Sequence, residues 1–274
     1  MPKLSRKEDL MREIAECPLY KIKTGIKDDC KTVIDFQKNK TGGWKGGYFH
    51  CAEPWFGDLE KAEVLFVSSN PSYSAEESKD KIVGGITLKR HHPDLESENP
   101  DPYVYLFKFF ESEMKRRIDP TTKKPYPNTY SIYWWRICKF AAWILGYDEK
   151  KEKYSLENLS RIALTEIVHC KSTSETGVRE CCDTCRDTWL DRIIELFACN
   201  GADSNKQKYV VLVGKVARAQ RKTIDDIVEK IVKKYPNLKI KVIETPHPGC
   251  RGLSDEDRKE AIIDQIKKQT LEHS

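Results

Sequence analysis

A short apolar run that stops at a polar tetrad constrains this chain more than any other stretch. Residues 64–67 read Val-Leu-Phe-Val, and residues 68–71 read Ser-Ser-Asn-Pro directly after them. An unbroken apolar run bounded by polar residues and proline is typical of a strand buried on both faces of a parallel sheet. The tetrad is then expected at the carboxyl edge of that sheet, where open α/β sheets bind their ligands.

Apolar strands alternate with helical segments along the rest of the chain. After the strand at 64–67, we predict strands at 161–169, 208–214 and 239–244, and helices at 131–146, 179–197, 216–234 and 254–268. Such alternation predicts a mostly parallel sheet with helices on both faces. The expected fold is therefore α/β, a three-layer αβα sandwich around a central four-stranded sheet.

The first half of the chain contains fewer periodic segments. We predict one helix over 4–16 and another over 103–117. The stretches 20–50 and 74–102 are typical of irregular polar chain, and 53–58 is typical of a turn.

Length and composition bound the class of protein. The chain has 274 residues, of which 39% are hydrophobic and 33% are charged, which suits a globular domain with an ample core. No linker-like segment divides it, so we expect one domain over 1–274, with an N-terminal helix and extended region over 1–58 and the α/β core over 59–274. A net charge of +5 permits a polyanionic partner without requiring one.

The chain also has features expected of an intracellular protein. No apolar run approaches the roughly 20 residues that a membrane span needs. The N-terminus has the pattern of a charged amphipathic helix and not of a signal peptide. We expect an intracellular protein, cytoplasmic or nucleoid-associated, that works as a monomer without a membrane.

Three of the predicted strands end in loops that carry chemically useful side chains. Asn70 follows the first strand, Glu166 lies in the second, and His247 follows the fourth. Because parallel strands end at the same edge of a sheet, we expect an amide, a carboxylate and an imidazole in one cleft.

At these residues the chain resembles the uracil-DNA glycosylase superfamily. Residues 68–71 are similar to its first motif in the Gly-x-Asn-Pro form. Residues 247–251, His-Pro-Gly-Cys-Arg, resemble the second motif, His-Pro-Ser-Pro-Arg, of the single-strand-selective members. Residues 165–171 are similar to the Thr-Asn-Val-Val-Lys-Cys-Arg segment of the iron–sulfur members, and 211–217 resemble their third strand. The resemblance covers about residues 60–268.

This resemblance implies a monofunctional DNA N-glycosylase of base excision repair. Such a hydrolase flips a deaminated or damaged base, uracil or a related one, out of single- or double-stranded DNA and hydrolyses its N-glycosidic bond. The implied catalytic residues are Asn70, which would hold the water, and His247, which would donate a hydrogen bond to the departing base.

The resemblance also implies contacts to the substrate. For the flipped base they are Ser69, Pro71, Tyr73, Phe107 and Glu166, and for the DNA they are Lys171, Lys215, Pro248, Gly249, Arg251 and Leu253. Arg251 occupies the position of the family's wedge residue, and Leu253 is the apolar candidate for the same task. The stacking aromatic is one of Tyr103, Phe107 and Phe110, and an aromatic side chain of the helix at 131–146 can also border the base.

Glu166 departs from the family pattern. Relatives read uracil with an asparagine at this position, which offers both a donor and an acceptor, whereas an ionised glutamate offers acceptors only. Glu166 is therefore protonated, or reads another base, or serves the scaffold. A glycosylase is better supported than an activity on uracil.

The chain contains ten cysteines, and a reducing compartment disfavours disulfides. Iron–sulfur members of the superfamily hold a [4Fe-4S] cluster with four cysteines, and Cys170 and Cys185 match one pair of them. Cys17, followed by Pro-Leu, resembles half of the other pair, and Cys30 or Cys51 would complete the set. An iron–sulfur cluster, zinc bound to the same thiolates, and unligated buried thiols all remain open.

Two rival functions also remain open. The first is a catalytically silent nucleic-acid-binding protein of the same fold, in which the basic helix 216–234 and Arg251 contact phosphates. The second is an unrelated α/β enzyme that uses His247 and Glu166 on a small nucleotide or nucleoside.

Overall fold

The structure is a computed structural model, and it describes ten stretches of the chain. They are residues 6–15, 17, 28–40, 52–71, 81–83, 86–88, 132–148, 159–172, 174–199 and 206–271. The chain divides into two compact units, each built from three separate segments. The first takes Met1–Trp55, Ser69–Phe110 and Glu166–Arg192, and the second takes Phe56–Ser68, Glu111–Thr165 and Ile193–Ser274. The predicted single domain stays a prediction.

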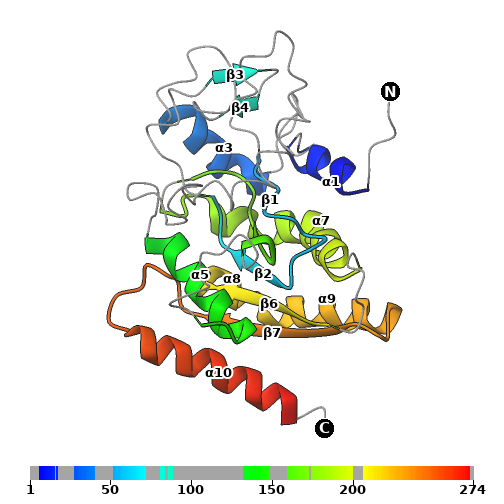
Figure 1. Cartoon of the computed structure of the whole chain (residues 1–274). Helices are drawn as coiled ribbons and strands as arrows, with labels where there is room; N and C mark the ends of the chain where they lie inside the picture. Colours follow the sequence, from blue (N-terminus) through cyan, green and yellow to red (C-terminus); the bar gives the residue numbers. More distant parts are fainter. Residues whose placement is uncertain are drawn as a thin grey trace. The chain divides into compact units, whose positions relative to one another are not determined.

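Five strands form the main sheet in the order β1-β5-β2-β6-β7. They are β1 (Trp55–Phe56), β5 (Ile162–Glu166), β2 (Val64–Ser68), β6 (Gln207–Val213) and β7 (Lys239–Thr245). Of these, β2, β6 and β7 lie side by side in Figure 1. β2 pairs in parallel with β6, and β6 pairs in parallel with β7. The predicted α/β class and mostly parallel sheet are confirmed.

The four predicted strands are all present, and β1 is a fifth. The prediction of a turn over 53–58 was wrong for Trp55 and Phe56, because two residues are too few to show a period-2 pattern. Every residue of β2 and β5 is buried, as expected of central strands that are covered on both faces.

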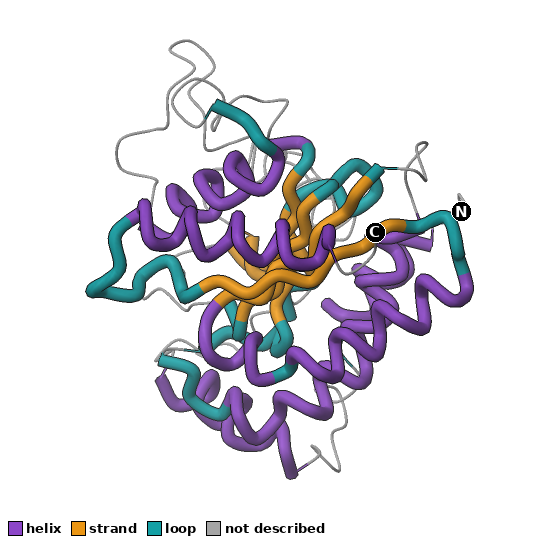
Figure 2. The backbone as a smooth tube through the Cα atoms, turned by 90° about the horizontal axis from the view of Figure 1, so that it is seen from below, coloured by secondary structure: helices purple, strands orange, loops and turns teal. Residues whose placement is uncertain are grey.

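Four helices of the second unit lie against the sheet. They are α5 (Ile132–Leu145), α8 (Gly214–Ala219), α9 (Arg221–Lys234) and α10 (Asp255–Leu271). Neighbouring residues of β7 point to opposite faces: Lys241 donates to the carbonyl of Ile266 in α10 at 3.3 Å, whereas Glu244 pairs with Arg218 and Arg221 on α8 and α9. Figure 2 shows helices on either side of the strands.

Capping residues in the sequence mark the end of α5 and the start of α10, whereas the break between α8 and α9 was not predicted. α5 is followed by Gly146 at φ 72°, the left-handed conformation that glycine adopts after a helix. α10 begins with a capping box, since the Asp257 N–H donates to Ser254 Oγ and the Ser254 N–H donates to the Asp257 carboxylate. The predicted single helix over 216–234 was wrong in one respect, because Gln220 separates α8 from α9.

The first unit contains α1 (Arg6–Ala15), α3 (Asp28–Lys40), most of α7 (Val178–Cys199), and a two-stranded antiparallel sheet of β3 (Lys81–Val83) and β4 (Ile86–Leu88). α1 confirms the helix predicted over 4–16, and it buries Leu10, Met11 and Ile14. In the described part of the chain, no helix is both long and apolar enough to cross a membrane.

Two elements of the first unit contradict the prediction of irregular chain. α3 falls within 20–50, and it lacks a regular apolar stripe because most of its residues are polar. The antiparallel pair of β3 and β4 falls within 74–102. In the sequence, two glycines stand between these strands, a pair typical of tight hairpin turns. The helix predicted over 103–117 lies outside the described residues.

Candidate active site

The loop that follows β7 selects one tautomer of the neutral His247 ring. The backbone N–H of Gly249 donates to Nδ1 of His247 at 3.0 Å. Because Nδ1 accepts this bond, the neutral ring carries its proton on Nε2 and can donate a hydrogen bond there. The His247 residue is exposed to solvent. The second unit therefore presents an imidazole N–H donor with a fixed tautomer.

Glycines and one tyrosine surround this imidazole. Gly214, the first residue of α8, has φ 82°, and a Cβ there would lie 3.3 Å from the Cβ of His247. The ring of half-buried Tyr133, from α5, lies 5.4 Å from the imidazole centroid at an angle of 42°. The many aromatic residues of the helix at 131–146 led us to expect one of them beside the base, but nothing in the sequence singles out Tyr133.

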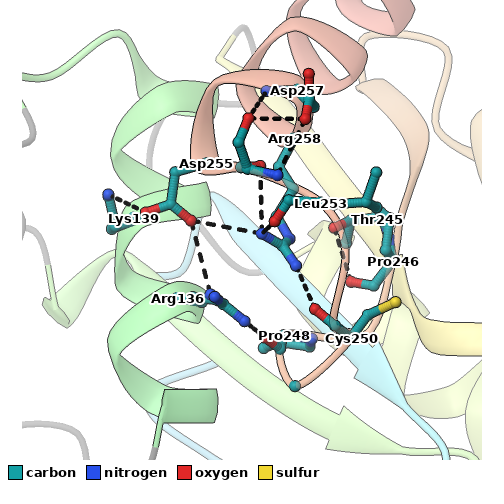
Figure 3. A network of polar contacts seen from close by, with 12 residues as sticks. Arg136, Lys139, Thr245, Pro246, Pro248, Cys250, Leu253, Asp255, Asp257 and Arg258 are labelled. Atoms are coloured by element: carbon teal, nitrogen blue, oxygen red, sulfur yellow. Dashed lines mark hydrogen bonds and ion pairs between the residues drawn. The ribbon is translucent and has the colours of Figure 1, made fainter.

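Partly buried charged side chains hold the backbone of the His247 loop (Figure 3). Arg136 of α5 donates to the carbonyl of Pro248, and its Nε lies 3.6 Å from the carboxylate of Asp255. Lys139 donates to the same carboxylate at 2.6 Å. Pro248, predicted as a DNA contact, is itself buried. These residues anchor the loop between α5 and the start of α10.

The far side of the same loop is exposed. Arg251 and Leu253 are exposed. Among the described residues, Leu253 is the one large hydrophobic residue that is exposed, with 40% of its surface accessible to solvent. Lys215 is exposed in the first turn of α8, directly after Gly214. The DNA contacts predicted for these three side chains require this accessibility.

In the first unit, a network around Ser172 orients the side chain of Asn70. Its Nδ2 donates to Ser172 Oγ at 3.0 Å and to the carbonyl of Pro71 at 2.9 Å. The Ser172 N–H in turn donates to the same Pro71 carbonyl at 3.2 Å. Ser69 Oγ approaches Oδ1 of Asn70 at 3.5 Å. Nδ2 also donates to the carbonyl of Ser172 at 3.4 Å. Because these two carbonyls only accept hydrogen bonds, they distinguish Nδ2 from Oδ1, so Asn70 has a defined acceptor oxygen.

Ser172 is a site residue that the motifs did not reveal. It lies two residues after Cys170 and is 2% exposed. A loop with left-handed backbone at Ser174 and Glu175 follows it and leads into α7. Two consecutive non-glycine residues in that conformation are unusual, and the sequence carries no signal for them.

Two other predicted contacts are buried in the first unit. Glu166, at the end of β5, is 6% exposed. The Lys171 ammonium lies 2.7 Å from the Glu53 carboxylate, and both side chains are less than one-tenth exposed. This buried pair favours a structural role for Lys171 over the DNA contact predicted for it.

The remaining predicted site residues are distributed as follows. Asn70, Ser69, Pro71 and Glu166 belong to the first unit, and His247 belongs to the second. The meeting of the amide and the imidazole in one cleft stays a prediction. Tyr73, Tyr103, Phe107, Phe110 and Cys51 lie outside the described residues.

Buried thiols gather in the first unit. Cys17, Cys30, Cys170 and Cys185 are each at most 9% exposed. The pKa of the Cys181 thiol is raised by a hydrogen bond with Cys30, by burial, and by the nearby Cys170 and Cys185. Burial raises the pKa of Cys185, with Cys17 and Cys30 adding to the effect. The described residues contain no group of three or more His, Cys, Asp or Glu side chains arranged to hold a metal ion.

His169 supports the backbone beside these thiols. Its ring Nδ1 lies 2.6 Å from the carbonyl of Glu53 and therefore carries the proton of the neutral ring. Burial lowers the pKa of His169 to about 4. Its backbone N–H also bonds Cys185, which lowers the pKa of that thiol against the larger effect of burial.

The comparisons with known proteins name no family. No protein-family model matches the chain, and a search of curated proteins finds no matching relative. The functional conclusion therefore depends on the residues of the site.

Proposed function

We propose that this protein is a monofunctional DNA glycosylase that hydrolyses the N-glycosidic bond of a deaminated or otherwise damaged base. The observation that carries the proposal is the hydrogen bond from the Gly249 N–H to His247 Nδ1. It leaves Nε2 as the donor, and a donor is what a departing base needs where negative charge grows on its oxygen.

The reaction adds water across one bond. The C–N bond between sugar and base breaks and its electron pair leaves with the base, while the sugar carbon acquires positive charge as in glycoside hydrolysis. The oxygen of water then bonds to that carbon, and its proton passes to solvent. His247 stabilises the charge on the base and stays neutral throughout.

Asn70 is proposed to place the water. Its Nδ2 is held by Ser172 and Pro71, so Oδ1 is the atom that accepts a hydrogen bond from water. An amide is a poor base, and its contribution is orientation, which suffices for a stable leaving group. β2 and β7, which lead to Asn70 and His247, both run parallel to β6. That topology supports a glycosylase-like three-layer sandwich.

The exposed side chains of the His247 loop suit DNA as the substrate. Leu253 is apolar and exposed, and Arg251 beside it is exposed and cationic. An apolar side chain can enter the base stack while cations contact phosphates. Glu166 leaves the target base open, because an ionised carboxylate does not offer the donor that uracil recognition uses. A base-stacking role for Tyr133 beside His247 is part of the same proposal.

The silent DNA-binding alternative is less well supported. Arg218 and Arg221 pair with Glu244, and Lys234 pairs with Glu195. Much of the positive charge of α8 and α9 is thus neutralised by neighbouring carboxylates, which weakens a phosphate-binding face on these helices.

We also propose that Cys17, Cys30, Cys170 and Cys185 hold a [4Fe-4S] cluster. In a cubane each cysteine binds a different iron, so the four thiols need not converge on one point as they would around a single ion. Their burial in the first unit suits thiolate ligation. The cluster would fix the segments that bear these cysteines. Iron and acid-labile sulfide near four per chain would support it, whereas zinc or a metal-free protein would contradict it.

A panel of oligonucleotides, each with one lesion, tests the activity. Alkali cleavage after incubation reveals the abasic product. We expect excision of at least one lesion, with the rate reduced by at least about a hundredfold in His247→Ala and in Asn70→Ala. Lys267→Ala, an exposed change on α10, is the control. A folded protein that excises no lesion would overturn the proposal.

A further inference from the structure

A buried arginine ties together the exposed turn that bears Arg251 and Leu253. Arg258 lies in α10, and its side chain is 0% exposed. Its guanidinium donates to the carbonyls of Cys250 at 2.6 Å, of Ser254 at 3.2 Å, and of Leu253 (Figure 3). One planar group therefore joins both ends of the turn over 250–254.

The carboxylate of Asp255 pairs with this arginine and with two other cations. Asp255 Oδ1 lies 3.6 Å from Arg258 Nη1 and 3.6 Å from Arg136 Nε, and Oδ2 lies 2.6 Å from Lys139. Three cations thus lie around the carboxylate of Asp255. Burying a guanidinium has a large solvation cost. The N–H donors of the Arg258 guanidinium bind backbone carbonyls of the turn over 250–254, whose side chains are exposed.

We propose that Arg258 is a positioning residue that holds the turn over 250–254 in the shape that enters duplex DNA. The inference rests on the proposed glycosylase function. Entry into a base stack is more favourable when the wedge is ordered beforehand, because no loop entropy is then lost on binding. The fork of the guanidinium fixes several carbonyls at once, which an ammonium cannot do.

This role separates two substrates that carry the same lesion. In duplex DNA the turn must enter the stack and replace the flipped base. In a single strand there is no partner strand to open, and the lesion reaches the site without the wedge. A loss of the turn's shape therefore affects the duplex reaction selectively, whereas general damage to the protein or to His247 affects both reactions.

The experiment measures kcat/KM on one lesion in single-stranded and in duplex oligonucleotides of the same sequence. For Arg258→Met we expect a loss of about a hundredfold on the duplex, the scale of a small misplacement, and little change on the single strand. Leu253→Ala should show the same selectivity. Lys259→Met removes a cation from the neighbouring exposed position of α10 and should change neither rate.

The Arg258→Met protein retains the means to fold. Asp255 keeps Arg136 and Lys139 as partners, and Cys250, Leu253 and Ser254, whose carbonyls lose the guanidinium, are exposed residues. If the methionine variant does not fold, Arg258→Lys takes its place. It keeps the buried charge without the planar guanidinium, and we expect it to show the same selective loss on the duplex.

The outcomes are distinct. Equal losses on both substrates, or no loss on the duplex, would overturn the role of Arg258 while leaving the glycosylase intact. A wild-type protein that excises the lesion from neither substrate would overturn the proposed function, and this inference with it.

Discussion

The backbone N–H of Gly249 lies 3.0 Å from Nδ1 of His247, and a Cβ on Gly249 would lie 3.1 Å from the same atom. One small residue thus supplies the hydrogen bond that selects the tautomer and leaves space for the ring. The relationship makes the tautomer of His247 directly testable.

Gly249→Pro and Gly249→Ala form a matched pair, since both add a Cβ but only proline removes the N–H. We expect the proline variant to be slower in excision than the alanine variant by about tenfold, the value of one hydrogen bond of about 1.4 kcal/mol. Nitrogen NMR of labelled histidine should show the Nε2–H tautomer in the wild type and a tautomer mixture in Gly249→Pro. Equal rates and identical spectra would contradict the role of the N–H.

Ser172 and Asn70 should act as one functional group. Their side chains meet at 3.0 Å, so Ser172→Ala leaves the Asn70 amide less well oriented. We expect a reduction in kcat of about tenfold with little change in KM. In an Asn70→Ala background, the same serine change should have almost no effect, because the group it orients is gone. Additive losses in this double-mutant cycle would show that Ser172 acts elsewhere.

The central strands were predictable because their signal is local. The apolar run at 64–67 becomes β2, and the strands before and after α9 appear close to their predicted bounds. Polar residues at the strand ends likewise pointed to Asn70 and His247, since parallel topology follows from alternating strands and helices. The additional strand β1 was missed because its two residues are paired only through the fold.

The supporting residues of the site were not predictable for a related reason. Ser172 reaches Asn70 across 102 positions of sequence, and Arg136 reaches Pro248 across 112. Arg258 looks in the sequence like any charged helix residue, yet it is fully buried. Contacts between distant segments leave no periodic pattern, so a single sequence contains no trace of them.

Gly177 should tolerate a side chain far less well than Gly146. Both have left-handed backbone, with φ 75° and φ 72°. A Cβ on Gly177 would lie 2.4 Å from the backbone nitrogen of Val33 in α3, whereas a Cβ on Gly146 would meet nothing within 4 Å. Gly146→Ala should therefore cost only the left-handed strain of about 1–2 kcal/mol. Gly177→Ala should cost clearly more of the free energy of unfolding, because α3 must move away from the start of α7.

Urea denaturation of the two alanine variants measures this difference. A free energy of unfolding that falls equally in both would contradict the close approach of α3 to Gly177. Circular dichroism at zero urea serves as the check that each variant starts from the folded state.

His169 should make the free energy of unfolding depend on pH. Its pKa is about 4 in the folded protein and 6.5 when unperturbed, so between these values the unfolded chain binds a proton that the folded chain does not. The free energy of unfolding should therefore fall as the pH is lowered through this window, by about 2 kcal/mol between pH 7 and pH 4.5 from this residue alone. Below pH 4 both states are protonated and its contribution stops changing.

The comparison that isolates His169 is the wild type against His169→Asn, which keeps a donor for the Glu53 carbonyl and does not titrate. Urea denaturation at pH 7 and at pH 4.5 should show a smaller decrease for the variant, whatever its stability at pH 7. The carboxylates, including Glu53 in its pair with Lys171, titrate in both proteins and cancel in the difference. Equal decreases in the two proteins would contradict the lowered pKa of His169, because the imidazole would then titrate alike in the folded and unfolded states.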